Sequence, residues 1–219
     1  MLRRIDLRDK QGPVDLHLPR PDFDDQAPIS DVRKIISGVR EGGDASIREL
    51  TKKFDSVDVV QPLVSQNELE DAWRSLGSEL AEALEFAHDR ILHFHQEEAS
   101  QSHEVTQDDI KVTSVPQPVE RAGLYVPGGL AVYPSTVLMT ALPAKAAGVD
   151  ELVLCTPPNP SGDIEQVVLA AAYLCGVSEV YKIGGVQAVA AMAYGSETIR
   201  PVDVIAGPGN IWVATAKQE

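Results

Sequence analysis

The first half of the chain carries apolar residues at the three- and four-residue spacing of amphipathic helices. One helix is expected to begin near Ser30 and to stop at Gly42-Gly43, and a second to begin with Asp44 as its cap. The apolar faces of these two helices consist of Val32, Ile35, Ile36, Val39, Ile47, Leu50 and Phe54. Residues 30–109 are therefore predicted to be a helical region, preceded by an extended, proline-rich arm over residues 1–29.

Within this region, a further helical stretch is expected from Ser65 towards Ser100, with a break near Gly77. Ser65 and Glu68 have the spacing of a capping box, in which each side chain accepts a hydrogen bond from the other residue's backbone N–H. The pattern then changes, because residues 110–119 alternate apolar and polar positions and contain two prolines. We expect residues 110–119 to form an extended connector.

From Arg121 onward, short apolar runs alternate with helix-like segments. Runs with the composition of buried strands lie at residues 123–126, 151–156, 180–184 and 202–206. The segments between them with a helical pattern lie at residues 136–147, 164–175 and 187–194, and another helix is expected to begin near residue 210. Strands and helices that alternate in this way form right-handed βαβ units. The fold class is therefore α/β, with a parallel sheet after the helical region.

The chain is acidic, with a net charge of −14 from 33 Asp and Glu against 19 Lys and Arg. Most of the excess lies in the first half, because residues 120–219 hold 5 basic and 9 acidic side chains. An acidic surface repels polyphosphates and anionic lipids, so neither nucleic acid nor a membrane is an expected partner. We expect no signal peptide at the N-terminus, and the sequence has no apolar run of about 18 residues that would span a membrane. A cytoplasmic location is expected.

The cysteines and histidines do not indicate a metal site. Cys155 and Cys175 lie in apolar runs, which is typical of buried structural thiols rather than of a disulfide or a zinc motif. His88, His93 and His95 lack the i, i+4 spacing of a zinc site on a helix. We predict no metal ligand in this chain and no nucleophile–base pair in its second half.

Glycine-containing turns follow three of the predicted strands, with the sequences YVPGG, GGVQ and GPGN. In a parallel α/β sheet such turns share one edge, where glycine lets the backbone approach a ligand and helix N-termini bind phosphate groups. Tyr125, Gln187 and Asn210 are the polar side chains in these turns, and they are the candidate ligand contacts. The pattern favours a nucleotide or another phosphorylated ligand.

Each of these features also has a purely structural interpretation. Glycine-rich turns occur for tight geometry alone, Tyr125 can pack in a core, and Gln187 and Asn210 can cap their own helices. The dinucleotide fingerprint G-x-G-x-x-G is absent, as is the phosphate-loop pattern that ends in Gly-Lys-Ser/Thr. Any nucleotide is therefore expected to bind in another way.

The second half of the chain resembles the histidinol dehydrogenase family. The runs that carry the resemblance are RAGLYVPGGLAVYPSTVLMTALPAKAAGV from residue 121, LVLCTPP at 152–158, LCGV at 174–177, IGGVQAVAAMAYGSETI at 183–199 and VDVIAGPGNIWVATAK at 202–217. The resemblance covers nearly everything after residue 110. The helical first half is similar to the N-terminal region of the family, more loosely.

That family oxidises L-histidinol to L-histidine through histidinal in two NAD-linked steps, the last stage of histidine biosynthesis. Its members are zinc-dependent homodimers built from two related, incomplete Rossmann-like domains. The resemblance implies an incomplete Rossmann-like, NAD-binding domain over residues 110–219. It also implies that Tyr125, Gln187 and Asn210 occupy the NAD-contacting positions of the family.

The chain departs from the family in length, because family members are roughly double its size. Their zinc ligands and a Glu-His pair for acid–base chemistry lie downstream of the Gly-Pro-Gly-Asn turn, and no Glu-His dipeptide occurs in this sequence. We therefore expect the chain to be the N-terminal half of the enzyme and to be inactive alone. Two alternatives stay open, a related dehydrogenase for another alcohol and a non-catalytic, half-length binding or assembly module.

Overall fold

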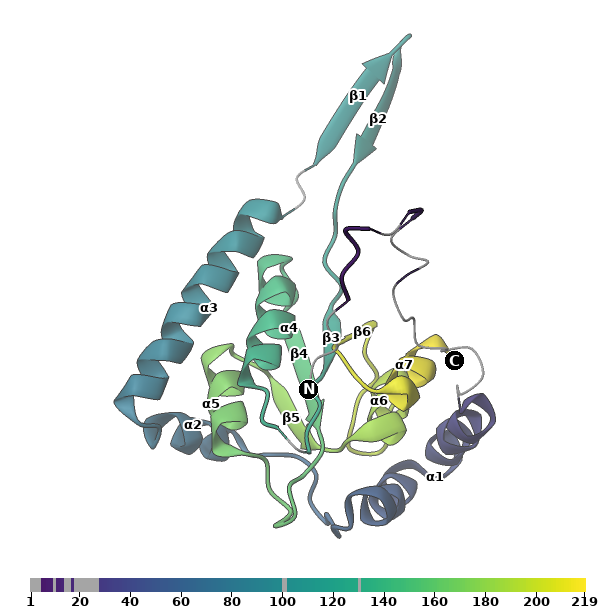
Figure 1. Ribbon diagram of the computed structural model, residues 1–219, viewed down its shortest axis with the longest axis vertical. Coiled ribbons are helices and arrows are strands. Elements are labelled where there is room, and N and C mark those ends of the chain that lie inside the picture. The colour runs from purple at the N-terminus through teal and green to yellow at the C-terminus, as the bar shows by residue number, and fades with distance from the viewer. Residues whose placement is uncertain (1–4, 10, 14–16, 18–27, 100–101, 130) are drawn as a thin grey trace.

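A four-stranded parallel sheet organises the computed structural model, which describes residues 5–9, 11–13, 17, 28–99, 102–129 and 131–219 (Figure 1). The strands are β3 (Arg121–Tyr125), β4 (Glu151–Thr156), β5 (Glu179–Lys182) and β6 (Val204–Ala206). They pair in the order β5-β4-β3-β6. In chain order this is third, second, first and fourth, the arrangement of half a Rossmann sheet. The predicted α/β class, with helices preceding a parallel sheet, is confirmed.

Helices cover both faces of the sheet (Figure 1). One face packs against α2 (Gln66–Arg74), α3 (Ser78–Glu98), α4 (Pro134–Ala146) and α5 (Gln166–Leu174), and the other against α1 (Ile29–Asp55), α6 (Gly185–Tyr194) and α7 (Ile211–Gln218). Strand β4 contributes Leu152 and Leu154 to the first core and Val153 and Cys155 to the second, because successive side chains point to opposite faces. A strand buried on both faces needs a continuous apolar run, and such a run predicted β4.

The long helix α1 breaks at Gly43, where the glycine pair predicted a stop. Gly43 has φ 51° and ψ −137°, and the helix resumes at Asp44. The Glu197 carboxylate accepts a hydrogen bond from the Asp44 N–H at 2.7 Å, so a distant side chain caps the second half of the helix. The Asp44 carboxylate instead accepts hydrogen bonds from the backbone N–H and the hydroxyl of Thr198. Asp44 therefore holds the loop after α6 rather than its own helix, and its predicted capping role is wrong.

Replacing Glu197 by alanine is expected to lower the free energy of unfolding by about 1–2 kcal/mol, the usual cost of a lost cap with its charge at a helix N-terminus. The substitution leaves the Asp44 N–H without its acceptor. Urea unfolding curves of the two forms measure the difference. Glu49→Ala, on an exposed position of the same helix, is the control. Equal losses in the two variants would contradict the capping role.

The Ser65–Glu68 capping box and the buried cysteines agree with the sequence patterns. The Ser65 hydroxyl accepts a hydrogen bond from the Glu68 N–H at 3.2 Å, and the Glu68 carboxylate accepts one from the Ser65 N–H at 2.8 Å. Cys155 and Cys175 are buried free thiols, and burial raises the pKa of each to about 12. Most of the predicted arm over residues 1–29 lies outside the described residues. None of the described helices is long and apolar enough to cross a membrane.

An antiparallel hairpin that the sequence patterns missed projects away from the body of the protein (Figure 1). Its strands β1 (His103–Gln107) and β2 (Ile110–Ser114) are joined by Asp108 and Asp109, whose φ values of 47° and 64° are left-handed. Two consecutive left-handed residues make the tight turn of a two-residue hairpin. Every residue of both strands is exposed. Residues 103–107 are thus a strand rather than the end of a helical region, and residues 110–114 form a strand within the predicted connector.

The two edges of the parallel sheet are covered differently. Along β5, the Lys182 N–H donates to the Pro62 carbonyl at 2.8 Å and the Val64 N–H donates to the Val180 carbonyl at 2.9 Å. None of the described segments pairs with the outer edge of β6. Val204 on β6 is 46% exposed, whereas strands inside parallel sheets are normally buried on both faces. The β6 edge is therefore the open edge of this sheet.

Candidate functional site

The turns at the carboxyl edge of the sheet pack against one another through their glycines. A Cβ atom on Gly128 would lie 2.7 Å from Pro157, and one on Gly184 would lie 2.5 Å from the same proline. Gly207 has φ 130°, and a Cβ there would lie 2.1 Å from the Tyr125 carbonyl oxygen. At these three positions the structural interpretation of the glycines holds, because protein atoms fill the space that the missing side chains leave.

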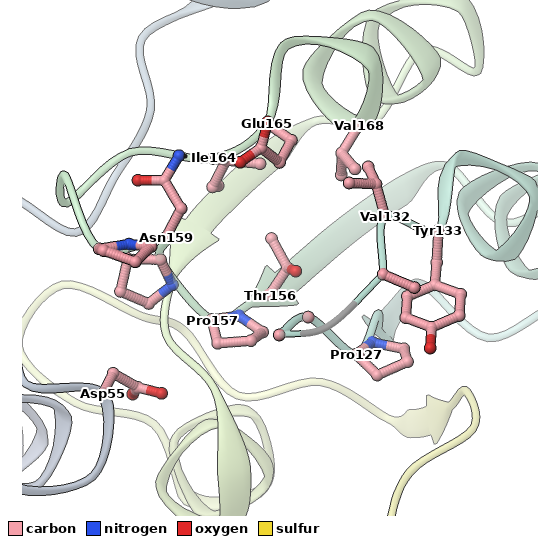
Figure 2. Close-up of a pocket in the computed structure, with 15 residues that line it drawn as sticks. Asp55, Pro127, Val132, Tyr133, Thr156, Pro157, Asn159, Ile164, Glu165 and Val168 are labelled. Atoms are coloured by element: carbon pink, nitrogen blue, oxygen red, sulfur yellow. Dashed lines mark hydrogen bonds between the residues drawn. The ribbon is translucent and has the colours of Figure 1, made fainter.

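Gly129 differs from these glycines and faces a pocket. It has φ 110°, and apart from Gly129 itself and its chain neighbours no described atom lies within 4 Å of the place where its Cβ would stand. The pocket has a volume of about 410 Å³ and lies between the turns after β3 and β4 (Figure 2). Its walls come from residues 127–129 and 131–133, from residues 156–160, 164, 165 and 168, and from Asp55 at the end of α1. Its size is typical of small-molecule sites.

Two carboxylates line this pocket, and they differ in their partners. Glu165 accepts a hydrogen bond from the side-chain amide of Asn159 at 3.1 Å. The Asp55 Oδ2 atom is buried and has no hydrogen-bond partner among the residues that the structure describes. Burial raises the pKa of the Asp55 carboxyl. The described lining contains no Lys, Arg or His. The pocket therefore favours ligand groups that donate hydrogen bonds over additional negative charge.

Tyr125 and Gln187, two of the predicted contact residues, are buried beside the turn after β5. Tyr125 ends β3 and is 5% exposed, and its hydroxyl accepts a hydrogen bond from the Gly185 N–H at 3.0 Å. Burial raises the pKa of Tyr125, and the charge of the nearby Asp55 adds to the effect. Gln187 lies in the first turn of α6 and is 1% exposed, and its Oε1 atom has no partner within the described part of the chain. A buried amide oxygen without a partner is costly, so ligand binding is one way to satisfy it.

Asn210, the third predicted contact, is exposed at the N-terminus of α7. Its Oδ1 atom accepts hydrogen bonds from the backbone N–H groups of Trp212 and Val213 at 3.1 and 3.2 Å, so it caps the helix. Its amide NH₂ group is left to donate elsewhere. The structure thus brings the three predicted side chains to one edge of the sheet, but none of them lines the 410 Å³ pocket. Their role as NAD contacts stays a prediction.

Sequence reasoning missed Asp55 and Asn159, because neither lies in a glycine-rich turn. The prolines at 157 and 158, directly after a predicted strand, were the available signal for the second wall of the pocket. Asp55 had no comparable signal, because its neighbours in the pocket lie far away along the chain. Within the described ranges, no three His, Cys, Asp or Glu side chains are grouped to hold a metal ion. The residues that the structure describes therefore do not fit a zinc site.

Comparison with known proteins gives a consistent result over most of the chain. The family model for histidinol dehydrogenase matches residues 18–219. Histidinol dehydrogenase from Methanothermobacter thermautotrophicus is 49% identical over 202 residues, which cover 91% of this chain and 46% of that protein. The corresponding enzyme from Parasynechococcus marenigrum is 48% identical over 192 residues, covering 84% of this chain and 42% of the relative.

A solved structure agrees with the sequence relatives. The crystal structure of histidinol dehydrogenase from Elizabethkingia anophelis matches with a TM-score of 0.86 and 36% identity, over 91% of this chain and 46% of that one. The chain therefore spans less than half the length of the relatives it matches. Because the family model covers residues 18–219 and the solved fold agrees, the chain belongs to the histidinol dehydrogenase family.

Proposed function

We propose that this chain supplies the NAD-binding part of an enzyme that oxidises L-histidinol to L-histidine through histidinal, with NAD and zinc. The observation that carries the proposal is the strand order β5-β4-β3-β6, the order of half a Rossmann sheet, with polar side chains in the turns at its carboxyl edge. Membership of the family supports the proposal that the substrate is L-histidinol and that the complete enzyme is a homodimer. This chain corresponds to 42–46% of the length of these relatives, so we place the catalytic residues of the enzyme in the part of the relatives that this chain does not cover.

The side chains at the carboxyl edge are suited to hold a dinucleotide. The Tyr125 hydroxyl accepts from Gly185, which leaves its proton to donate to a ligand oxygen. The free Oε1 of Gln187 is an acceptor for a ligand N–H or O–H, and the free NH₂ group of Asn210 is a donor for a phosphate or ribose oxygen. Bound NAD supplies the hydride acceptor. This chain contributes binding and orientation, and we assign it no step that involves zinc.

Substitution of Asn210 separates the cofactor role from the capping role. Asn210→Ala is expected to raise the Kd for NAD about tenfold, through loss of one hydrogen bond to a charged or polar group, and to cost about 1 kcal/mol of stability through loss of the cap. Asn210→Asp keeps the oxygen that caps α7 but loses the amide donor, so it should weaken NAD binding and keep the stability. Titration calorimetry and thermal melts measure the two effects.

The comparison of the two variants decides between the two roles. An Asn210→Asp protein that binds NAD as tightly as the unsubstituted chain would assign Asn210 to capping alone. Failure of the unsubstituted chain to bind NAD would contradict the proposed function itself.

A further inference from the structure

The pocket between the turns after β3 and β4 occupies the place where a sheet of this strand order receives a ribose. In such sheets a carboxylate near the end of the second strand accepts a hydrogen bond from the ribose 2′-hydroxyl. Here the second strand is β4, and it runs into Thr156, Pro157 and Pro158, which carry no carboxylate. Asp55 reaches the same pocket from the C-terminal end of α1 (Figure 2). A different element therefore presents a carboxylate at this place.

Among the described residues, no basic side chain of α1 forms a salt bridge with Asp55. Arg48 and Lys52 both pair with Asp58, with Nε–Oδ1 and Nζ–Oδ2 distances of 2.6 and 3.7 Å. The Oδ2 atom of Asp55 is buried, and the structure shows no hydrogen-bond partner for it among the described residues. A buried carboxylate oxygen that receives no hydrogen bond destabilises the fold, unless a ligand group donates a hydrogen bond to it.

The lining of the pocket discriminates between a hydroxyl and a phosphate. Glu165 is a second carboxylate on the wall, and the described lining residues include no cation. A 2′-phosphate, which carries close to two negative charges at neutral pH, would face both carboxylates with no compensating charge. A ribose diol would instead donate a hydrogen bond to the free oxygen of Asp55. The two ligands therefore differ in both charge and hydrogen bonding at this point.

We propose that Asp55 accepts a hydrogen bond from the 2′-hydroxyl of the adenosine ribose and thereby selects NAD against NADP. The inference rests on the proposed function, since it assumes that the carboxyl edge holds a dinucleotide. Asp55 is in this view a specificity-determining residue, supplied by the helical region rather than by the sheet.

Binding of three nucleotides to four forms of the chain tests the assignment. The ligands are NAD, NADP and NAD with a 2′-deoxyadenosine, measured by titration calorimetry on the unsubstituted chain, Asp55→Ala, Asp55→Asn and the control Asp58→Asn. We expect the unsubstituted chain to bind NAD at least about tenfold more tightly than either analogue, the ratio typical of a lost polar contact. Asp55→Ala should weaken NAD binding about tenfold and leave the 2′-deoxy analogue unaffected. Asp58→Asn should change none of these ratios.

Thermal melts show that the variants fold. The stability of the two Asp55 variants should not fall, because each removes a buried carboxylate charge that has no partner among the described residues. Equal weakening of NAD and of the 2′-deoxy analogue by Asp55→Ala would overturn the ribose assignment. NAD binding that Asp55→Ala and Asp55→Asn leave unchanged would overturn the inference and leave the proposed function standing. An unsubstituted chain that binds neither NAD nor NADP would overturn both.

Discussion

Replacing Arg121 by methionine is expected to lower the free energy of unfolding by about 3 kcal/mol, the lower end of the cost of removing one partner from a buried ion pair, because its two carboxylate partners are partly exposed. Arg121 begins β3, and its side chain is 6% exposed. It donates hydrogen bonds to Glu151 at 2.6 Å and to both carboxylate oxygens of Glu179 at 3.1 and 2.7 Å. Without it, the half-buried Glu179 keeps its charge but loses its cation. Urea unfolding at neutral pH measures the loss.

Arg200→Met is the matched control, because Arg200 pairs with the same Glu151 but is 65% exposed. Exposed ion pairs contribute little, so we expect a loss of about 1 kcal/mol or less. If both substitutions lowered the free energy of unfolding equally, the larger contribution of Arg121 could not be attributed to its burial.

The same cluster gives the stability of the protein a defined dependence on pH. The hydrogen bond from Arg121 lowers the pKa of Glu179, and likewise that of Glu151, below the ordinary value of 4.5. A carboxylate with a lowered pKa in the folded state stabilises the fold above its ordinary pKa, and that contribution is lost as the pH falls through the lowered value. The unsubstituted protein should therefore lose stability as the pH drops from 4.5, and Arg121→Met should show a weaker dependence there.

Gly207→Ala is the substitution with the other large expected effect, a loss of about 4 kcal/mol. The backbone at Gly207 has φ 130°, which costs about 1–3 kcal/mol for a residue with a side chain. The new Cβ would also lie 2.1 Å from the carbonyl oxygen of Tyr125. Relief of that overlap must move backbone at the end of β3, and overpacking of this kind adds about 1–3 kcal/mol. Chemical denaturation of the soluble variant measures the sum.

Gly129→Ala is its control, since φ there is 110° but the added Cβ would enter open space. It should show the backbone cost of about 1–3 kcal/mol without the overlap. Comparable losses at the two glycines would show that the contact with Tyr125 does not matter for stability.

The parallel sheet was predictable because its signal is local. Strand β4 was expected at the residues where it occurs, since a strand buried on both faces requires a continuous apolar run. The hairpin of β1 and β2 was missed because all its residues are exposed, so burial imposes no alternation on them. Its Asp108-Asp109 turn is also less distinctive than the Asn-Gly pair of typical hairpins.

The candidate site was predictable only in part, because only some of its residues have a local signal in the sequence. Tyr125, Gln187 and Asn210 stand in turns that the strand pattern places at one edge. Asp55 and Glu197 act across long distances in the chain, the first in a pocket formed by the turns after β3 and β4, the second as the cap of α1. The hydrophobic periodicity of the sequence does not indicate contacts of this kind, because they depend on how α1 packs on the sheet.

The open edge of β6 also sets the rates at which backbone amides exchange with deuterium. The Lys182 amide at the β5 edge is held by the Pro62 carbonyl, so it exchanges only when that pairing opens. The amides of β6 that point away from β3 have no such acceptor among the described residues, and water reaches them in the folded state. Protection therefore declines across the sheet, from the covered strand to the uncovered one. Whatever binds along β6 will slow the exchange of these amides, and deuterium uptake within Val204–Ala206 would report it.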